Sequence, residues 1–333
     1  MRRLHGLCLL LGAALFALLI HEVGVDALRR ESAHLGWGVL AIVAVEGLAD
    51  LLHTAGWQRC FPRGERPGVW RLWGPQLAGA AINLVTPTAG LAGEVVRGSL
   101  APRACGSDGV VASLAVSKLS AALADTALVL GGAAVLLAHG PLGAGARGAV
   151  AGASGLLAGG VLGFGLLQRR GRLAGFLAAP PVLAQLFGRE RAARWVRAAA
   201  AIDRRIAALH TAERGALREA VALHLLGNAV GALQIHLFFS VLGLTSSLAA
   251  VGTVFLVARA IDVLAFFVPG RLGVQEGARM FAMSLVGIEP SLGLLFSLIL
   301  RLEQLAWAGL GFAAYGVLLW QRRATAGVVG VTR

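Results

Sequence analysis

The chain has 333 residues, of which 57% are hydrophobic and only 14% are charged. Soluble domains carry about 25% charged residues, so this composition excludes an ordinary soluble protein. Several apolar runs approach the roughly 20 residues that a helix needs to cross a bilayer, which predicts an all-α polytopic membrane protein. The net charge of +13 does not indicate nucleic acid as a partner, because the arginines are distributed between hydrophobic spans, as the positive-inside rule describes.

The N-terminal apolar run, residues 7–20, follows two arginines and is similar to a secretory signal. No small-residue cleavage site follows it, so we predict an uncleaved first span with the N-terminus in the cytoplasm. Five further full spans are predicted from their length and hydropathy. They are 35–52, 109–137, 148–167, 217–244 and 290–320. The six full spans place the C-terminus in the cytoplasm as well.

One pattern occurs twice, each time inside an apolar stretch: a proline, six residues, a glutamate, two residues and an arginine. Its members are Pro87, Glu94 and Arg97 in the first copy and Pro269, Glu276 and Arg279 in the second. A proline followed by glycines breaks a helix and frees backbone groups that lipid cannot satisfy. Such a break at membrane depth must line a cavity that is buried in protein or filled with water. The recurrence indicates an internal repeat.

The apolar segments beside the first break, 74–85 and 91–100, are too short to cross a membrane alone. We therefore predict two proline-broken re-entrant helical units, at 74–101 and 247–287. In each unit the glutamate and the arginine lie three residues apart on the restarted helix and share a face. A single copy would fit a proline kink with a neutralised ion pair equally well, but two copies favour a functional cavity.

Three predicted spans separate the two broken units, and an odd number makes the units open to opposite faces of the membrane. This predicts an inverted repeat, with repeat unit 1 at 74–137 and repeat unit 2 at 247–320, inside a single integral membrane domain, 1–333. The repeat extends to two further cations, since Lys118 follows Arg97 by 21 residues and Arg301 follows Arg279 by 22.

The long basic stretch at 168–216 is predicted to be a cytoplasmic loop. Within it, at 189–210, apolar residues recur at helical spacing and arginines occupy the rest of the helical wheel. This pattern is typical of an interfacial helix on anionic lipid. An ordinary cytoplasmic loop that follows the positive-inside rule is the alternative.

The remaining polar residues give little sign of a cofactor or a metal. The span 217–244 contains His224 and Asn228 on one face, and hydrogen bonding between helices is the common role of such residues. The three cysteines are scattered, without metal-ligand spacing. We therefore expect neither a disulfide framework, nor a metal, nor a cofactor.

The two broken stretches resemble those of a known family. The second reads Pro-Gly-Arg-Leu-Gly-Val-Gln-Glu-Gly from Pro269 to Gly277, and the first combines Asn83 with a Gly-Glu-x-x-Arg element that ends at Arg97. Together they resemble the lysylphosphatidylglycerol synthase transmembrane family, also called flippase-like membrane proteins. The Gln-Glu-Gly form is most similar to its hopanoid-associated branch. One departure is Arg271, where the family usually has a second glycine, so the charge of the substrate stays open.

The resemblance implies a lipid transporter. In the family's namesakes this membrane region is held to move an aminoacylated lipid across the bilayer, while a separate soluble domain makes that lipid. The sequence ends at Arg333 without such a domain, so we expect no enzyme activity and assign no catalytic residues. The expected function is a flippase in the bacterial inner membrane, linked to hopanoid or lipid-modification pathways. It would move an amphiphile with a polar or anionic head group between leaflets.

The predicted substrate-binding residues belong to the two breaks and to the charged positions that follow them. They are Asn83, Pro87, Gly93, Glu94, Arg97, Lys118, Pro269, Gly273, Glu276, Arg279, Arg301 and Glu303. The arginines would bind a phosphate or carboxylate, and the glutamates would set the arginine geometry or exchange protons. Ionisable residues at membrane depth are functional candidates because they are costly to keep there. The expected partners are membrane lipids and lipid-biosynthesis enzymes.

Two other functions stay open. In a non-catalytic scaffold of a lipid- or hopanoid-synthesis complex, the charges of the repeat would be structural ion pairs. A membrane-embedded transferase would need a nucleophile or a carboxylate cluster for a metal, and the sequence contains no Asp-x-Asp or His-x-x-x-Asp element. The sequence leaves open the lipid, the direction and energy coupling of its movement, the oligomeric state, and whether the Glu–Arg pairs contact substrate or each other.

Overall fold

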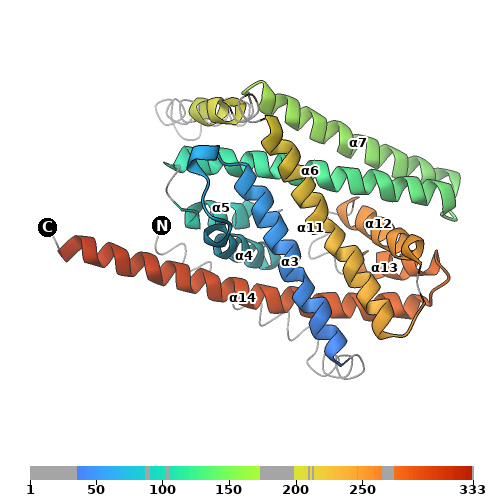
Figure 1. Ribbon diagram of the computed structural model, residues 1–333. Coiled ribbons are helices and arrows are strands. Elements are labelled where there is room, and N and C mark those ends of the chain that lie inside the picture. The colour runs from blue at the N-terminus through green and yellow to red at the C-terminus, as the bar shows by residue number, and fades with distance from the viewer. Residues whose placement is uncertain are drawn as a thin grey trace.

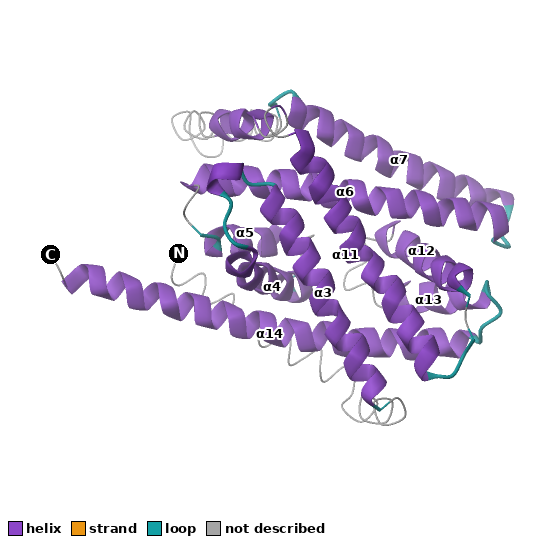
Figure 2. Ribbon diagram, viewed as in Figure 1, coloured by secondary structure: helices purple, strands orange, loops and turns teal. Residues whose placement is uncertain are grey.

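The described structure is a bundle of helices (Figures 1 and 2). The computed structural model describes residues 36–86, 91–102, 106–172, 199–208, 211, 214–245, 247–264 and 274–331. All regular elements within these ranges are helical. A chain of this composition must satisfy its backbone hydrogen bonds internally when it lies in lipid, and a helix does so within a single segment.

Five helices of the described residues are long and apolar enough to span a bilayer. They are α3 (Trp37–Arg59), α6 (Gly106–His139), α7 (Ala144–Arg169), α11 (Arg214–Val241) and α14 (Pro290–Val331). They coincide with five of the six predicted full spans. The other predicted span, at 7–20, lies outside the described residues. The described helices therefore make this a multi-pass membrane protein.

The first described span, α3, continues to Arg59 rather than ending near residue 52. The polar residues Glu46 and Asp50 suggested that the span ends close to them. In the structure both side chains line internal cavities instead of approaching the membrane surface. The helix can therefore carry these residues at membrane depth and continue beyond them.

Two broken units lie between the long helices. The first consists of α4 (Val69–Val85) and α5 (Leu91–Leu100), and the second of α12 (Leu248–Leu264) and α13 (Val274–Ser284). At 1.5 Å per residue, the 17 residues of α4 or of α12 reach about 26 Å, short of the roughly 30 Å hydrocarbon core. The connections between the two helices of each unit, 87–90 and 265–273, lie outside the described residues, and these ranges include the predicted tips at 87–90 and 271–273.

Helix α4 begins at Val69, earlier than the predicted start at residue 74. The predicted start was that of the apolar segment 74–85, and proline is best tolerated in the first turn of a helix. In the structure Pro75 lies inside the helix, and the preceding residues add packing contacts. Leu72 is completely buried in a cluster with Trp57, and this burial stabilises the extra turn.

Helices α3 and α11 lie side by side in the middle of the bundle and run in opposite directions (Figure 1). His53 of α3 contacts His224 of α11, and six residues later Arg59 pairs with Glu219 at 3.4 Å. Because the contact position rises along α3 while it falls along α11, the pair is antiparallel.

The two broken units are packed in a crossed manner. Helix α6, which follows the first unit, packs on α12 of the second unit, and α14, which follows the second unit, packs on α4 of the first. In both contacts a glycine faces the carbonyl oxygen of a leucine and the Cβ of the alanine one turn later. The glycine is Gly311 of α14, opposite Leu77 and Ala81 of α4, and Gly132 of α6, opposite Leu256 and Ala260 of α12. A residue without a Cβ lets two membrane helices approach to backbone contact.

The basic loop is described only in part. Residues 199–208 are helical, and the rest of 189–210 lies outside the described residues. Ile206 is completely buried in a cluster with Cys60, Val116 and Ala220. Ile206 of the described part is therefore covered by protein. The interfacial helix at 189–210 stays a prediction.

The crossed glycine contacts yield a stability prediction. Gly132→Ala and Gly311→Ala each place a methyl group against a backbone carbonyl, and we expect each to destabilise the fold by about 1–3 kcal/mol. The matched control is Gly152→Ala in α7, where no described atom lies near the position of a Cβ. The control should leave the melting temperature of the detergent-solubilised protein unchanged or slightly higher. Equal losses in all three variants would contradict the crossed packing.

Candidate functional site

In the first broken unit, two cations hold the carboxylate of Glu94, which lies in the first turn of α5. Its Oε1 accepts hydrogen bonds from Arg97 of α5 and Lys118 of α6, both at 2.8 Å. Arg97 is buried, with its guanidinium 4.4 Å from the ring centre of Trp57, in a cation–π contact. The Lys118 side chain is 50% exposed, whereas that of Glu94 is 15% exposed. The pair is therefore accessible from the α6 side.

Two glycines set the depth at which α5 lies on α4. The N–H of Gly93 donates to Asn83 Oδ1 of α4 at 2.7 Å. A Cβ on Gly93 would collide with Asn83 and with the carbonyl oxygen of Gly79, and a Cβ on Gly79 would collide with the stem of Arg97. The close approach of these backbones thus determines where Glu94 and its partners lie.

In the second broken unit, the charged residues of α13 pair with the helices on either side. Oε1 of Glu276 accepts hydrogen bonds from Arg301 of α14, at 3.2 Å from Nε and 3.1 Å from Nη2. Arg279 pairs with Asp262 of α12 at 3.6 Å and donates to the carbonyl of Gln275 at 3.2 Å. Both ion pairs are enclosed, because the four side chains are each less than a fifth exposed. These contacts tie α13 to both neighbouring helices.

The two units share one interaction and differ in another. In both, the glutamate in the first turn of the short helix pairs with a cation of the long helix that follows. These pairs are Glu94 with Lys118 and Glu276 with Arg301. The units differ at the arginine, since Arg97 bonds to the glutamate of its own helix while Arg279 reaches the neighbouring helix.

A pair of histidines joins α3 to α11. The Nδ1 atoms of His53 and His224 are 2.9 Å apart, and the rings stack with 5.2 Å between their centres. His53 packs on Gly227 and His224 packs on Gly56, so each helix offers a histidine and a glycine to the other. The sequence signal is His-x-x-Gly, present at 53–56 and again at 224–227. These residues are absent from the predicted site.

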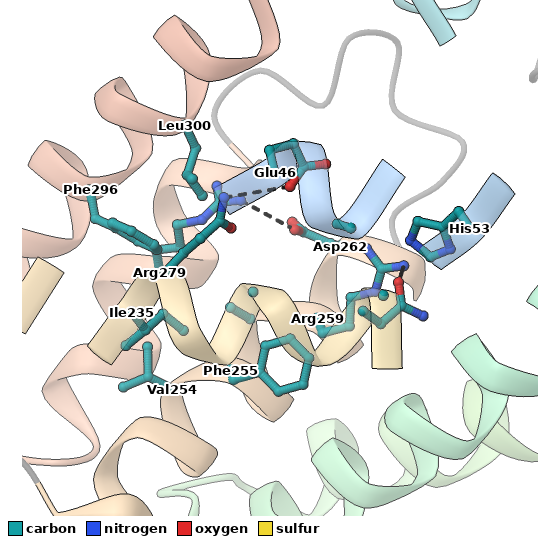
Figure 3. Close-up of a pocket in the computed structure, with 16 residues that line it drawn as sticks. Glu46, His53, Ile235, Val254, Phe255, Arg259, Asp262, Arg279, Phe296 and Leu300 are labelled. Carbon is teal, nitrogen blue, oxygen red and sulfur yellow. Dashed lines mark hydrogen bonds and ion pairs between the residues drawn. The ribbon is translucent and has the colours of Figure 1, made fainter. Parts of the chain in front are cut away.

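A cavity of about 250 Å³ lies between α3, α11, α12, α13 and α14 (Figure 3). Its polar lining includes two arginines, Arg259 and Arg279, and two carboxylates, Glu46 and Asp262, together with Asn228. Arg259 pairs with Asp125 of α6 at 2.5 Å and donates to Asn228 at 3.1 Å. The apolar lining consists of Ile235, Val254, Phe255, Phe296 and Leu300. The cavity thus combines paired arginines and carboxylates with apolar side chains, which suits an amphiphile with a polar head group.

A second cavity, of about 150 Å³, lies beside the first. Asp50 of α3 and Glu303 of α14 line it, and Glu46 of α3 lines both cavities. The Gln234 amide of α11 donates to Oε2 of Glu303 at 2.6 Å and lies 3.5 Å from Oε2 of Glu46. The carboxylates of α3 and α14 therefore meet around one amide.

Most of the described residues of the predicted site fall into two groups. Asn83, Gly93, Glu94, Arg97 and Lys118 gather at the first unit, and Glu276, Arg279 and Arg301 gather at the second. Glu303 lies apart from both groups, against Gln234 and in the second cavity. Pro87, Pro269, Arg271 and Gly273 lie outside the described residues. The prediction omits Glu46, Asp125, Arg259 and Asp262, although each is an ionisable residue inside a helix of the bundle. That property alone marks them as candidates.

These features define a multi-pass helical membrane protein with charged cavities beside two broken helical units. Residues 7–311 match the family model described as the lysylphosphatidylglycerol synthase TM region, and the chain belongs to this family. Comparisons with curated proteins and with solved structures give no match. Assignment to the hopanoid-associated branch stays a prediction.

The buried pair of Asp262 and Arg279 yields a second prediction. Asp262→Asn leaves the Arg279 guanidinium without its carboxylate, and we expect a loss of about 3–5 kcal/mol in stability. The double variant Asp262→Asn/Arg279→Gln removes both charges and should recover much of that loss. Thermal unfolding of the two single variants and the double variant in detergent measures the difference. A double variant less stable than Asp262→Asn would contradict a direct pairing.

Proposed function

We propose that the protein moves a lipid with a polar or anionic head group between the leaflets of the membrane. The observation that carries this proposal is the cavity lined both by Arg259 and Arg279 and by apolar side chains (Figure 3). Membership of a family described by the membrane region of a lipid synthase supports a lipid-related role. The head group would lie at the arginines while the tails stay in lipid.

The ion pairs suit such a transporter because they provide exchangeable partners. Moving a charged head group through hydrocarbon is unfavourable unless protein groups replace its water. Arg259 and Arg279 each have a carboxylate partner, so a phosphate would compete with Asp125 or Asp262 for a guanidinium. A guanidinium also binds phosphate oxygens in a bidentate manner.

We infer that the chain is built as an inverted repeat. The crossed contacts of Gly132 and Gly311 and the reciprocal contacts of His53 and His224 support two equivalent halves. A repeat axis in the membrane plane relates helices of opposite direction, whereas an axis along the membrane normal relates helices of the same direction. The antiparallel pairing of α3 with α11 therefore favours inversion over a parallel repeat.

An inverted repeat gives each broken unit access to a different face, as alternating access requires. The two glutamate–cation pairs differ in the exposure of the cation, since the side chain of Lys118 is 50% exposed and that of Arg301 only 14%. This difference supports a state in which the first unit is open and the second is closed.

Topology gives a direct test of the inverted repeat. Ser107→Cys and Ser291→Cys, placed in a variant without the native cysteines, mark the starts of the long helices that follow the two units. We expect an impermeant thiol reagent to label residue 107 from the cytoplasm and residue 291 from the outside. Labelling of both positions from the same face would rule out inversion.

Charge swaps test the transport role. Asp125→Arg/Arg259→Asp and Asp262→Arg/Arg279→Asp preserve each ion pair but place a carboxylate where an anionic head group would meet a guanidinium. We expect both variants to fold and to slow dithionite-detected movement of NBD-labelled phosphatidylglycerol in proteoliposomes about tenfold or more.

The control is the swap Arg59→Glu/Glu219→Arg at the more exposed α3–α11 pair, which should transport normally. Normal transport by both charge-swap variants of the preceding paragraph would show that these ion pairs have only a structural role. A wild-type protein that moves none of the lipids offered would favour the scaffold function.

A further inference from the structure

Three carboxylates in the bundle differ from those of the broken units. Glu46 and Asp50 lie one turn apart on α3, and Glu303 of α14 lines the same cavity. Glu303 is 6% exposed, so it has little access to water. Among the residues that the structure describes, none of the three has an ion pair with lysine or arginine. A charge-compensating group for them must come from elsewhere.

Packing between α3 and α14 holds these carboxylates together. The indole N–H of Trp307, one turn beyond Glu303, donates to the carbonyl of Val43 at 2.8 Å. The Trp307 ring lies against Gly47, where a Cβ would collide with it. This contact fixes the rotation of α14 on α3 and directs Glu303 towards the Gln234 amide, which it shares with Glu46.

Comparison of the two halves shows that a cation is missing here. The Gly311 and Gly132 contacts align α4 with α12, and in this alignment Ala80 stands where α12 has Arg259. Arg259 neutralises Asp125, whereas Ala80 lines the cavity beside the three carboxylates. One half therefore has an internal ion pair at this position, and the other has acidic groups without one.

The surrounding helices do not supply the missing charge. The nearby charged and titratable groups are His53 of α3, Arg97 of α5, Arg259 and Asp262 of α12, and Arg279 of α13. Each of these arginines already pairs with a different carboxylate: Arg97 with Glu94, Arg259 with Asp125 and Arg279 with Asp262. The amides of Gln234 and Gln304 are uncharged, and α4 contributes only apolar side chains to the cavity.

Protons satisfy these requirements better than a metal ion. A buried ionised carboxylate without a cation is unfavourable by several kcal/mol, and a proton removes that penalty. Adjacent carboxylates share protons as a coupled group. A metal ion would need several converging oxygen ligands, but the Gln234 nitrogen occupies the space between Glu46 and Glu303.

We propose that Glu46, Asp50 and Glu303 form a proton-binding site that couples lipid movement to a proton gradient. The coupling rests on the transport function proposed above. Glu46 lines both cavities, so its charge acts on the cavity that contains Arg259 and Arg279. A protonated Glu46 leaves the arginine cavity more positive and favours an anionic head group, whereas an ionised Glu46 opposes it. Proton and anionic lipid therefore bind together and move in the same direction.

The first experiment measures the protons without reference to transport. Infrared pH titration of the full-length protein in liposomes follows the C=O stretch of protonated carboxyl groups. We expect the titrating absorbance of the wild-type protein to decrease in Glu46→Gln/Glu303→Gln, while Asp50 and the other carboxyl groups still contribute. Ala80→Arg supplies the missing cation and should also decrease this absorbance, while its neutral control Ala80→Gln should leave it unchanged. An unchanged titration in Glu46→Gln/Glu303→Gln would overturn the proton site.

The second experiment measures coupling, with NBD-labelled phosphatidylglycerol in proteoliposomes under an imposed pH gradient. The gradient should accelerate movement severalfold in the wild-type protein and in Ala80→Gln, and should have no effect in Glu303→Gln. Wild-type movement that is equally fast with and without a gradient would overturn the coupling and leave the proposed function intact. A carboxyl band that titrates in a protein that moves no lipid would overturn the proposed function and the coupling, but not the proton site.

Discussion

The pairing of a glutamate in the first turn of each short helix with a cation on the following long helix organises this protein. α5 and α13 have 10 and 11 residues, too few to cross the hydrocarbon core. They are held at depth by side-chain contacts, and Glu94 and Glu276 provide the charged ones. A carboxylate in such a place requires a partner, and that requirement fixes the short helix against its neighbour. The cavities lie beside the helices positioned in this way.

The crossed packing of the halves depends on the absence of side chains. Gly132 and Gly311 let α6 approach α12 and α14 approach α4 until backbone atoms meet. The histidine–glycine contacts join α3 to α11 in the same manner. The two broken units and the helices beside them are therefore joined through close helix contacts. Buried polar networks at these contacts also specify the rotation of each helix.

The spans and the broken units could be predicted from hydropathy, proline and glycine, because lipid imposes length and backbone constraints that are visible in sequence. The spacing of Lys118 and Arg301 after the breaks also indicated which cations belong to the repeat. The partner of Arg279 could not be predicted, because Asp262 reaches it only through the packing of α12 on α13. The proximity of Glu46 and Asp50 of α3 to Glu303 of α14 could not be predicted either, because it depends on how the two helices are rotated against each other. The His-x-x-Gly repeat was available in the sequence, but its meaning appears only when the two helices are paired.

The most direct measurement is an experimental structure of the protein in a bilayer that contains lipids extracted from its native membrane. The account predicts a lipid head group in the cavity of Arg259 and Arg279, with its anionic or polar oxygens within hydrogen-bond distance of a guanidinium and its tails leaving towards lipid. A head group beside Glu94 and Lys118 would show the same lipid at the other unit. Lipids found only around the outside of the bundle, with both sites holding nothing but water, would contradict the account.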